Sequence, residues 1–195
     1  MTITRLFPAL VFALGLAACD QPVQPPAAPA APVAPAPPVA PVAPVLALDQ
    51  EGLRMVGEGG ATRLLAFDRP TDETVQVLTG VLGEPKNRST NSECGAGPID
   101  FVEWRNGLSA LFQQDKFVGW SLDGRAAGGV NLTTIDGVGI GSTARTLKAA
   151  LPSATVEETT LGQEFTAGSF SGILSGPGDD ATIQTIWAGV SCVFR

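Results

Sequence analysis

The sequence predicts an α+β protein, in which two tandem helix-plus-antiparallel-sheet units form one domain. Two segments carry helix signals, each predicted helix ends at a proline or at a glycine close to one, and short strands follow both breaks. We expect the domain to span residues 46–195, with repeat units at 46–122 and 131–195. This length of about 150 residues is typical of one ordinary domain.

The first unit is predicted to begin with two strands and a helix. Leu53–Val56 and Thr62–Phe67 have strand composition and flank a glycine-rich turn. Apolar residues at three- and four-residue spacing then predict a helix, which Thr71 or Asp72 can cap. Gly83 is expected to end this helix.

The same unit continues with the clearest sheet signal in the chain. Ile99–Arg105 and Leu108–Phe112 flank Asn106-Gly107, a dipeptide that favours tight hairpin turns because both residues tolerate positive φ. Phe117–Leu122 follows as a third strand. We therefore expect an antiparallel meander.

The second unit is predicted to repeat this order. Its helix runs from about Thr143 to Leu151, is capped by Ser142 and stops at Pro152. Its strands are expected near Leu132–Ile135, Thr155–Glu158, Ser169–Leu174, Ala181–Trp187 and Val190–Phe194.

The N-terminus has the pattern of an export signal. An apolar run from Leu6 to Leu16 follows Arg5 and precedes small residues, and it is shorter than the ~20 residues that a membrane-spanning helix needs. Leu16-Ala17-Ala18-Cys19 resembles the lipobox of bacterial lipoproteins, which implies cleavage after residue 18 and a lipid on Cys19. The alternative is an ordinary signal peptide, cut after Ala18, that happens to precede a cysteine.

Residues 19–45 are predicted to form a tether behind this cysteine. From Gln21 to Val45 the sequence is almost entirely Pro, Ala and Val, and it carries no charge. Such a composition favours extended polyproline II and semi-rigid spacers.

The two remaining cysteines are expected to pair. With Cys19 assigned to lipid, Cys94 and Cys192 form an even pair in an oxidising exported compartment, which favours a disulfide. The alternative is a reactive Cys94, which would need an activating base.

Composition limits the function classes. The chain has no histidine, the commonest general base and metal ligand, and its net charge of −7 argues against nucleic-acid binding. We expect no metal and no cofactor. Gly139-Ile140-Gly141-Ser142-Thr143-Ala144 fits a dinucleotide-binding pattern, but a glycine-rich turn before a short helix explains it better.

Two further groups of residues could support function. Trp120, between Gly119 and Ser121, is the candidate for an exposed interface aromatic, although core packing is the default for a tryptophan in a strand. Paired carboxylates for glycan hydrolysis could come from Glu93, Asp100 and Glu103.

The domain also has two resemblances. From Thr62 to Leu122, the strand, helix, Leu-Gly-Glu-Pro break and meander resemble the α+β unit of outer-membrane-assembly lipoproteins, which is found in tandem in β-lactamase-inhibitor proteins. Glu93–Pro98, with Phe117–Trp120 downstream, resembles an uncharacterised group of exported bacterial proteins.

These observations predict a lipid-anchored cell-envelope protein that faces the periplasm or the cell exterior. It is expected to be a non-catalytic binding or scaffolding module for an envelope protein or wall component, held to the membrane through Cys19. The alternative is an exported hydrolase of cell-wall or other glycans.

Overall fold

A computed structural model of the chain describes residues 44–126 and 132–193. These residues belong to a compact unit that extends from Ala40 to Arg195. The predicted signal peptide and almost all of the predicted tether, with Cys19, lie outside the described residues. No helix in the described part is long and apolar enough to cross a membrane.

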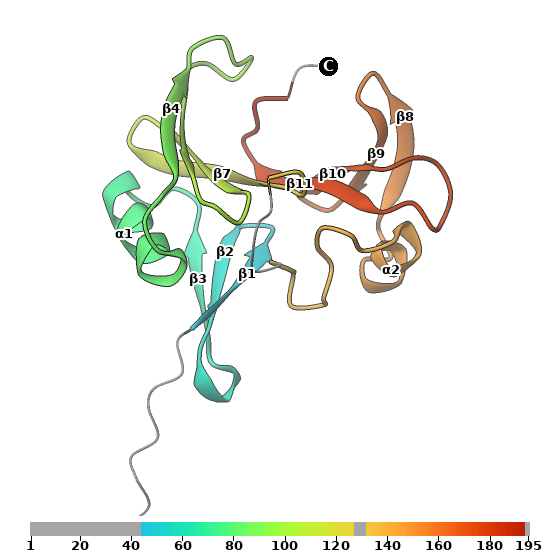
Figure 1. Cartoon of the computed structure of the whole chain (residues 1–195), viewed down its shortest axis with the longest axis horizontal. Coiled ribbons are helices and arrows are strands. Elements are labelled where there is room, and N and C mark those ends of the chain that lie inside the picture. Colours follow the sequence, from blue (N-terminus) through green and yellow to red (C-terminus); the bar gives the residue numbers. More distant parts are fainter. Residues whose placement is uncertain (1–43, 127–131, 194–195) are drawn as a thin grey trace, which may run out of the picture. The chain divides into compact units, whose positions relative to one another are not determined.

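Strands dominate the described chain and form two antiparallel sheets (Figure 1). The smaller sheet contains β1 (Val45–Asp49), β2 (Gly52–Val56) and β3 (Thr62–Ala66) in that order. The larger sheet has the order β4-β5-β6-β7-β11-β10-β9-β8. Its strands are β4 (Asn87–Asn91), β5 (Ile99–Glu103), β6 (Leu108–Gln113), β7 (Lys116–Asp123), β8 (Thr155–Thr159), β9 (Gly162–Ala167), β10 (Phe170–Leu174) and β11 (Ile183–Gly189).

The predicted α+β class with two tandem helix-plus-sheet units is wrong. Strands make up 47% of the described structure and helices 15%, and the described residues contain only the α-helices α1 (Thr71–Leu82) and α2 (Ala144–Ala150), besides the 3₁₀ turn η1 (Glu58–Gly60). Strands β7 and β11 pair with each other, so the strands of the two predicted units form one continuous sheet of eight. The chain is therefore mostly β.

Helix α1 confirms the predicted segment but not the predicted cap. Pro70 occupies the N-cap position and makes no side-chain hydrogen bond there, whereas Thr71 is already helical. Val75 and Leu78 are buried on the inner face. Gly83 ends the helix with φ 79°, a left-handed value that glycine adopts without a steric penalty.

The β5–β6 hairpin differs from the predicted two-residue turn. The amide of Trp104 donates to the carbonyl of Leu108 at 2.8 Å, and β5 ends at Glu103, so Arg105, Asn106 and Gly107 form a longer loop. Only Gly107 of these three has positive φ, at 87°. This arrangement matches a three-residue hairpin loop with glycine in its left-handed position.

The main core lies between one face of the eight-stranded sheet and a layer made by the three-stranded sheet and both helices. Trp120 is central to it: the side chain is 0% exposed, and its ring packs against Phe170. Its Nε1 donates to the carbonyl of Asp49 at 3.0 Å, which links β7 to the end of β1. The expectation of an exposed Trp120 at an interface is therefore corrected, because the burial of this large ring joins the two sheets.

Candidate binding groove

The second face of the eight-stranded sheet is not covered by the helices or by the small sheet. Residues directly paired in antiparallel strands share a face. The pairings place one row across all eight strands: Asn87, Glu103, Ser109, Ser121, Trp187, Ser171, Thr166 and Thr155. We call the face that carries this row the open face. Trp187 is the one aromatic residue in an otherwise polar row.

A groove with a volume of about 710 Å³ lies on the open face. Its apolar lining comes from Phe101, Leu111, Leu161, Ile173 and Trp187, which belong to four different strands and the β8–β9 turn. Trp187 lines the groove although its side chain is only 6% exposed, so neighbouring residues pack closely around it. The floor of the groove is therefore rigid and apolar.

Most of the remaining groove lining is polar and uncharged. Hydroxyl and amide groups come from Asn91, Ser121, Gln184, Thr185 and Ser191. These groups can donate and accept hydrogen bonds without the desolvation cost of a full charge. An apolar floor with polar groups around it is the usual composition of a binding site.

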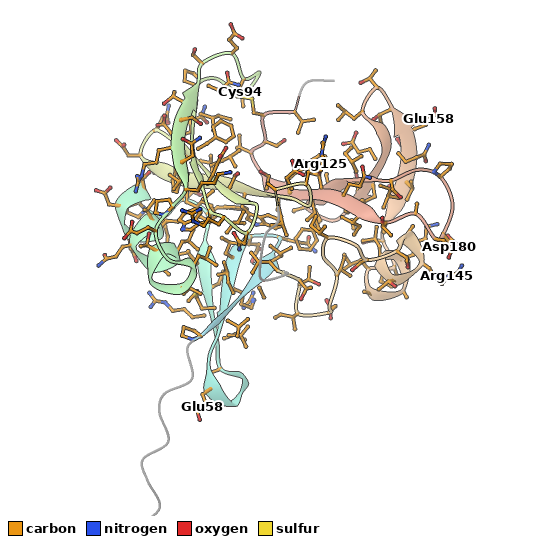
Figure 2. The ribbon with its side chains drawn as sticks, viewed as in Figure 1. Glu58, Cys94, Arg125, Arg145, Glu158 and Asp180 are labelled. Atoms are coloured by element: carbon orange, nitrogen blue, oxygen red, sulfur yellow. A yellow bond between two sulfur atoms is a disulfide. The ribbon has the colours of Figure 1, made fainter. Side chains whose placement is uncertain are left out.

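Arg125 is the cation among the residues that line this groove. Its side chain is 85% exposed, and its Nε lies 3.6 Å from Oδ1 of Asp123. The positive charge is thus at the edge of the groove and is shared with a carboxylate. Figure 2 labels this residue beside the eight-stranded sheet.

One wall of the groove is the segment that follows β11. After Gly189, the amide of Val190 donates to the carbonyl of Val118 at 2.8 Å, and residues 191–193 then border the groove. A side chain at Gly119 would collide with the carbonyl of Val190. Glycine at this position therefore allows the segment to cross β7 closely.

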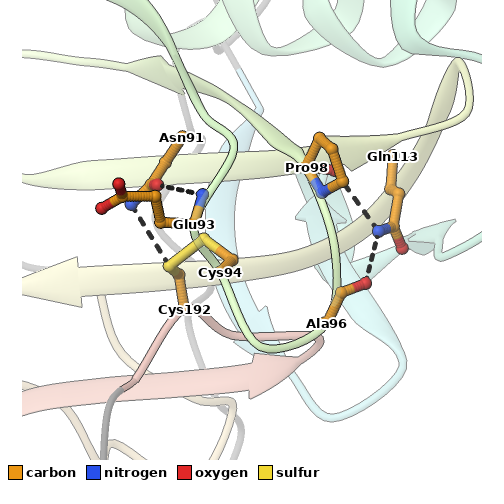
Figure 3. The surroundings of a disulfide bond; sticks show 7 residues. All are labelled: Asn91, Glu93, Cys94, Ala96, Pro98, Gln113 and Cys192. Carbon is orange, nitrogen blue, oxygen red and sulfur yellow. Dashed lines mark hydrogen bonds between the residues drawn. A yellow bond between two sulfur atoms is a disulfide. The ribbon is translucent and has the colours of Figure 1, made fainter.

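The disulfide between Cys94 and Cys192 fixes this segment (Figure 3). It joins the β4–β5 loop to the residue that lines the groove, across a sequence separation of 98 residues. Cys94 is buried with Ile99 and Leu111 in a second small core. The predicted disulfide is confirmed, and in this state Cys94 has no free thiol.

Side-chain hydrogen bonds hold the β4–β5 loop beneath the disulfide. Asn91 Nδ2 donates to Sγ of Cys192 at 3.5 Å, while Asn91 Oδ1 accepts from the amide of Glu93 at 2.8 Å. Gln113 Nε2 donates to the carbonyl of Ala96 at 2.7 Å (Figure 3). The loop is therefore attached to β4, to β6 and to the C-terminal segment.

Glu93, Asp100 and Glu103 were considered for hydrolysis. The two of them that lie on β5 do not form a carboxylate pair. Asp100 and Glu103 are three residues apart on β5, so they face opposite sides of the sheet. Thr90 donates to Asp100 at 2.5 Å, and Asn87 lies 3.4 Å from Glu103. Glu93 is exposed in the loop after β4.

The glycine-rich segment before α2 is explained by packing. A side chain at Gly139 would approach the carbonyl of Leu132 too closely, and Gly141 has φ 83°. Thr143, and not Ser142, caps α2 by accepting from the amide of Thr146 at 3.1 Å. The turn thus accounts for both glycines without a nucleotide.

Acidic and basic residues also meet at the surface beside α2. Lys148 Nζ lies 2.9 Å from Asp179. Arg145 Nη2 lies 3.1 Å from Asp180, and Figure 2 labels this second pair. The hydrogen bond from Lys148, and then its charge, lower the pKa of Asp179 below its ordinary value. Within the described ranges, no cluster of three or more His, Cys, Asp or Glu side chains could hold a metal ion.

Sequence reasoning identified the disulfide but missed the groove. Trp187 was expected in a strand, and the register that places it between Ser121 and Ser171 depends on pairing between distant strands. No local signal marks the open face in β11, because Trp187 is buried like the core residues Ile186 and Ala188 on either side of it.

Comparison of the chain with protein-family models, with curated proteins and with solved structures finds no match. The resemblances noted in the sequence therefore gain no support from these comparisons. The geometry of the groove is the basis for the functional inference.

Proposed function

We propose that this chain is a lipid-anchored cell-envelope protein whose domain binds an envelope protein or a wall component without catalysis. The observation that carries this proposal is the groove on the open face, with Trp187 in its floor and hydroxyl and amide groups around it. Binding surfaces combine an apolar centre with a polar rim in this way, and tryptophan is enriched among the residues that dominate their affinity.

The size of the groove supports this proposal. Its volume of about 710 Å³ falls within the range of ~300–1,000 Å³ that is usual for sites that bind small molecules. The disulfide holds one wall, and the packing of Trp187 holds the floor, before any partner binds. A preformed site loses less conformational entropy on binding than a flexible one.

The proposed anchor is a lipid on Cys19. Each buried methylene contributes ~0.8 kcal/mol, and more than one acyl chain is needed for stable attachment. A fatty-acid analogue supplied to growing cells should label the parent chain and leave a Cys19→Ser variant unlabelled. Equal labelling of both would refute the anchor.

Site-specific photo-crosslinking in intact cells tests the binding role. A photoreactive amino acid at Gln184, which is exposed at the groove, should give a discrete crosslinked product. The matched control is the same amino acid at Glu58, an exposed residue in η1 of the β2–β3 connection. Identical products from both positions, or none from Gln184, would contradict a groove that binds a partner.

A carboxylate hydrolase of wall glycans is the second function to consider, and no geometry of the described residues favours it. Asp100 and Glu103 face opposite sides of β5. Turnover of wall material that is lost on replacement of Glu93 or Glu103 would nevertheless establish it.

A further inference from the structure

We propose that the groove binds an extended basic segment of another polypeptide, with an apolar side chain over Trp187 and Lys or Arg side chains over the surrounding carboxylates. This inference rests on the proposed function and specifies its partner. Three features of the open face lead to it: the distribution of charge in its rows, the state of Arg125, and the unpaired backbone along one wall.

Two of the three open-face rows that cross the groove contain carboxylates, and none of the three contains a basic residue. Glu103 lies in the row of Trp187. One neighbouring row consists of Asp123, Thr185, Ile173, Glu164 and Glu157. The other consists of Ser89, Phe101, Leu111, Gly119 and Gly189. Asp123 pairs with Arg125 and Glu164 is buried at 6% exposure, so Glu103 on β5 and Glu157 on β8 are the carboxylates of these rows that flank the apolar centre on its two sides.

Arg125 does not make the surroundings of the groove positively charged. It lies next to Asp123 in an exposed ion pair, so its charge is largely offset by that carboxylate. Glu103 on β5 and Glu157 on β8 remain on opposite sides of the groove. The whole chain carries a net charge of −7, so long-range attraction also favours a basic partner and opposes a second copy.

The backbone of the C-terminal wall favours a polypeptide over a glycan. Among the described residues, Ser191, Cys192 and Val193 make no backbone hydrogen bond, although all three line the groove and are half-buried. Main-chain N–H and C=O groups that have no partner among the described residues can pair with an added extended strand. The disulfide at Cys192 holds this segment in place for such pairing.

Fluorescence anisotropy with defined peptides tests the proposal on the full-length protein in detergent. The probe is a labelled ten-residue peptide in which lysine alternates with valine around a central phenylalanine. The control peptide carries glutamate in place of lysine, and a six-unit N-acetylglucosamine oligomer serves as the glycan probe. We expect the lysine peptide to bind at least about tenfold more tightly than the glutamate peptide, because like charges oppose docking.

Salt and two charge variants then locate the site. Affinity for the lysine peptide should fall as salt rises from 0.05 to 0.5 M, because screening shortens the reach of surface charges. Gln184→Lys and Glu157→Lys should each weaken it about fivefold through like-charge repulsion. Ser153→Lys adds the same charge at an exposed residue after α2 and should leave affinity within about twofold.

Several results would overturn this inference. One is that both peptides bind equally tightly, and another is that only the glycan binds. A third is that Gln184→Lys leaves the affinity for the lysine peptide unchanged. A fourth is that a second copy of the chain occupies the groove in a concentration-dependent dimer. Peptide binding that appears only after removal of Phe194 and Arg195 would identify the chain's own end as the occupant. A partner crosslinked at Gln184 that has no basic segment would leave the proposed function intact and refute this inference alone.

Discussion

Removal of the disulfide should destabilise the domain by several kcal/mol. The change is Cys94→Ala together with Cys192→Ala, which avoids a buried thiol or hydroxyl because Cys94 is only 6% exposed. The crosslink spans a sequence separation of 98 residues, and the chain-entropy model gives about 4.7 kcal/mol for a loop of this length. For a domain of this size, the midpoint of thermal unfolding should fall by about 10–15 °C.

Urea unfolding followed by tryptophan fluorescence measures this loss. All three tryptophans, Trp104, Trp120 and Trp187, belong to the described domain and are buried, so the signal reports on its core. The measurement compares the oxidised parent, the reduced parent and the double alanine variant. Reduction should move the parent to the stability of the variant, while the variant itself should not respond to reductant.

A loss below about 1 kcal/mol would refute the reasoning. It would mean that the crosslink restricts the unfolded chain far less than its span implies. A parent that is indifferent to reductant, although mass mapping shows that the disulfide has been reduced, would lead to the same conclusion.

Three further predictions concern individual contacts. Trp120→Phe should lower the free energy of unfolding, measured in urea, by about 2–3 kcal/mol, because it leaves a cavity and removes the hydrogen-bond donor to the Asp49 carbonyl. A decrease of less than about 0.5 kcal/mol would contradict this. Gly172→Ala should lower the free energy of unfolding by about 1–3 kcal/mol, because the added carbon collides with the backbone of β11. Gly176→Ala adds a carbon in open space and should leave stability unchanged. Equal effects of the two variants would contradict this packing. Lys148→Met should raise the pKa of Asp179 toward its ordinary value of 3.8 in a carboxyl NMR titration, and an unchanged pKa would exclude the ion pair as its cause. Since the folded pKa of Asp179 is lowered, its stabilising contribution in the parent is present above pH 4 and is lost as the pH falls through the folded value.

Local signals predicted the elements whose causes are local. Helix α1 follows from its apolar spacing and from Gly83, and the β6 and β7 strands follow from their apolar composition beside the Asn106-Gly107 turn. Three strands were missed for physical reasons. Val45–Asp49 resembles the end of the tether, Asn87–Asn91 is a polar edge strand, and Gly162–Ala167 contains few strand-forming residues at its start.

The fold class could not be predicted because it depends on one long-range pairing. Strands β7 and β11 are separated in sequence by more than 50 residues, and neither shows locally that it pairs with the other. The same register buries Trp120 opposite Ala188 and places Trp187 opposite Ser121. Both tryptophans lie in apolar strands, so the sequence alone does not distinguish the core ring from the groove ring.

The position of β1 has a consequence for how a tethered molecule would present its binding surface. Val45 starts β1, and the sheet of β1 packs against the core face, whereas the groove belongs to the opposite face. The start of β1 and the groove thus belong to opposite sides of the large sheet. If the proposed anchor holds the chain from its N-terminal side, a partner in the groove would occupy the face of the large sheet that β1 does not cover.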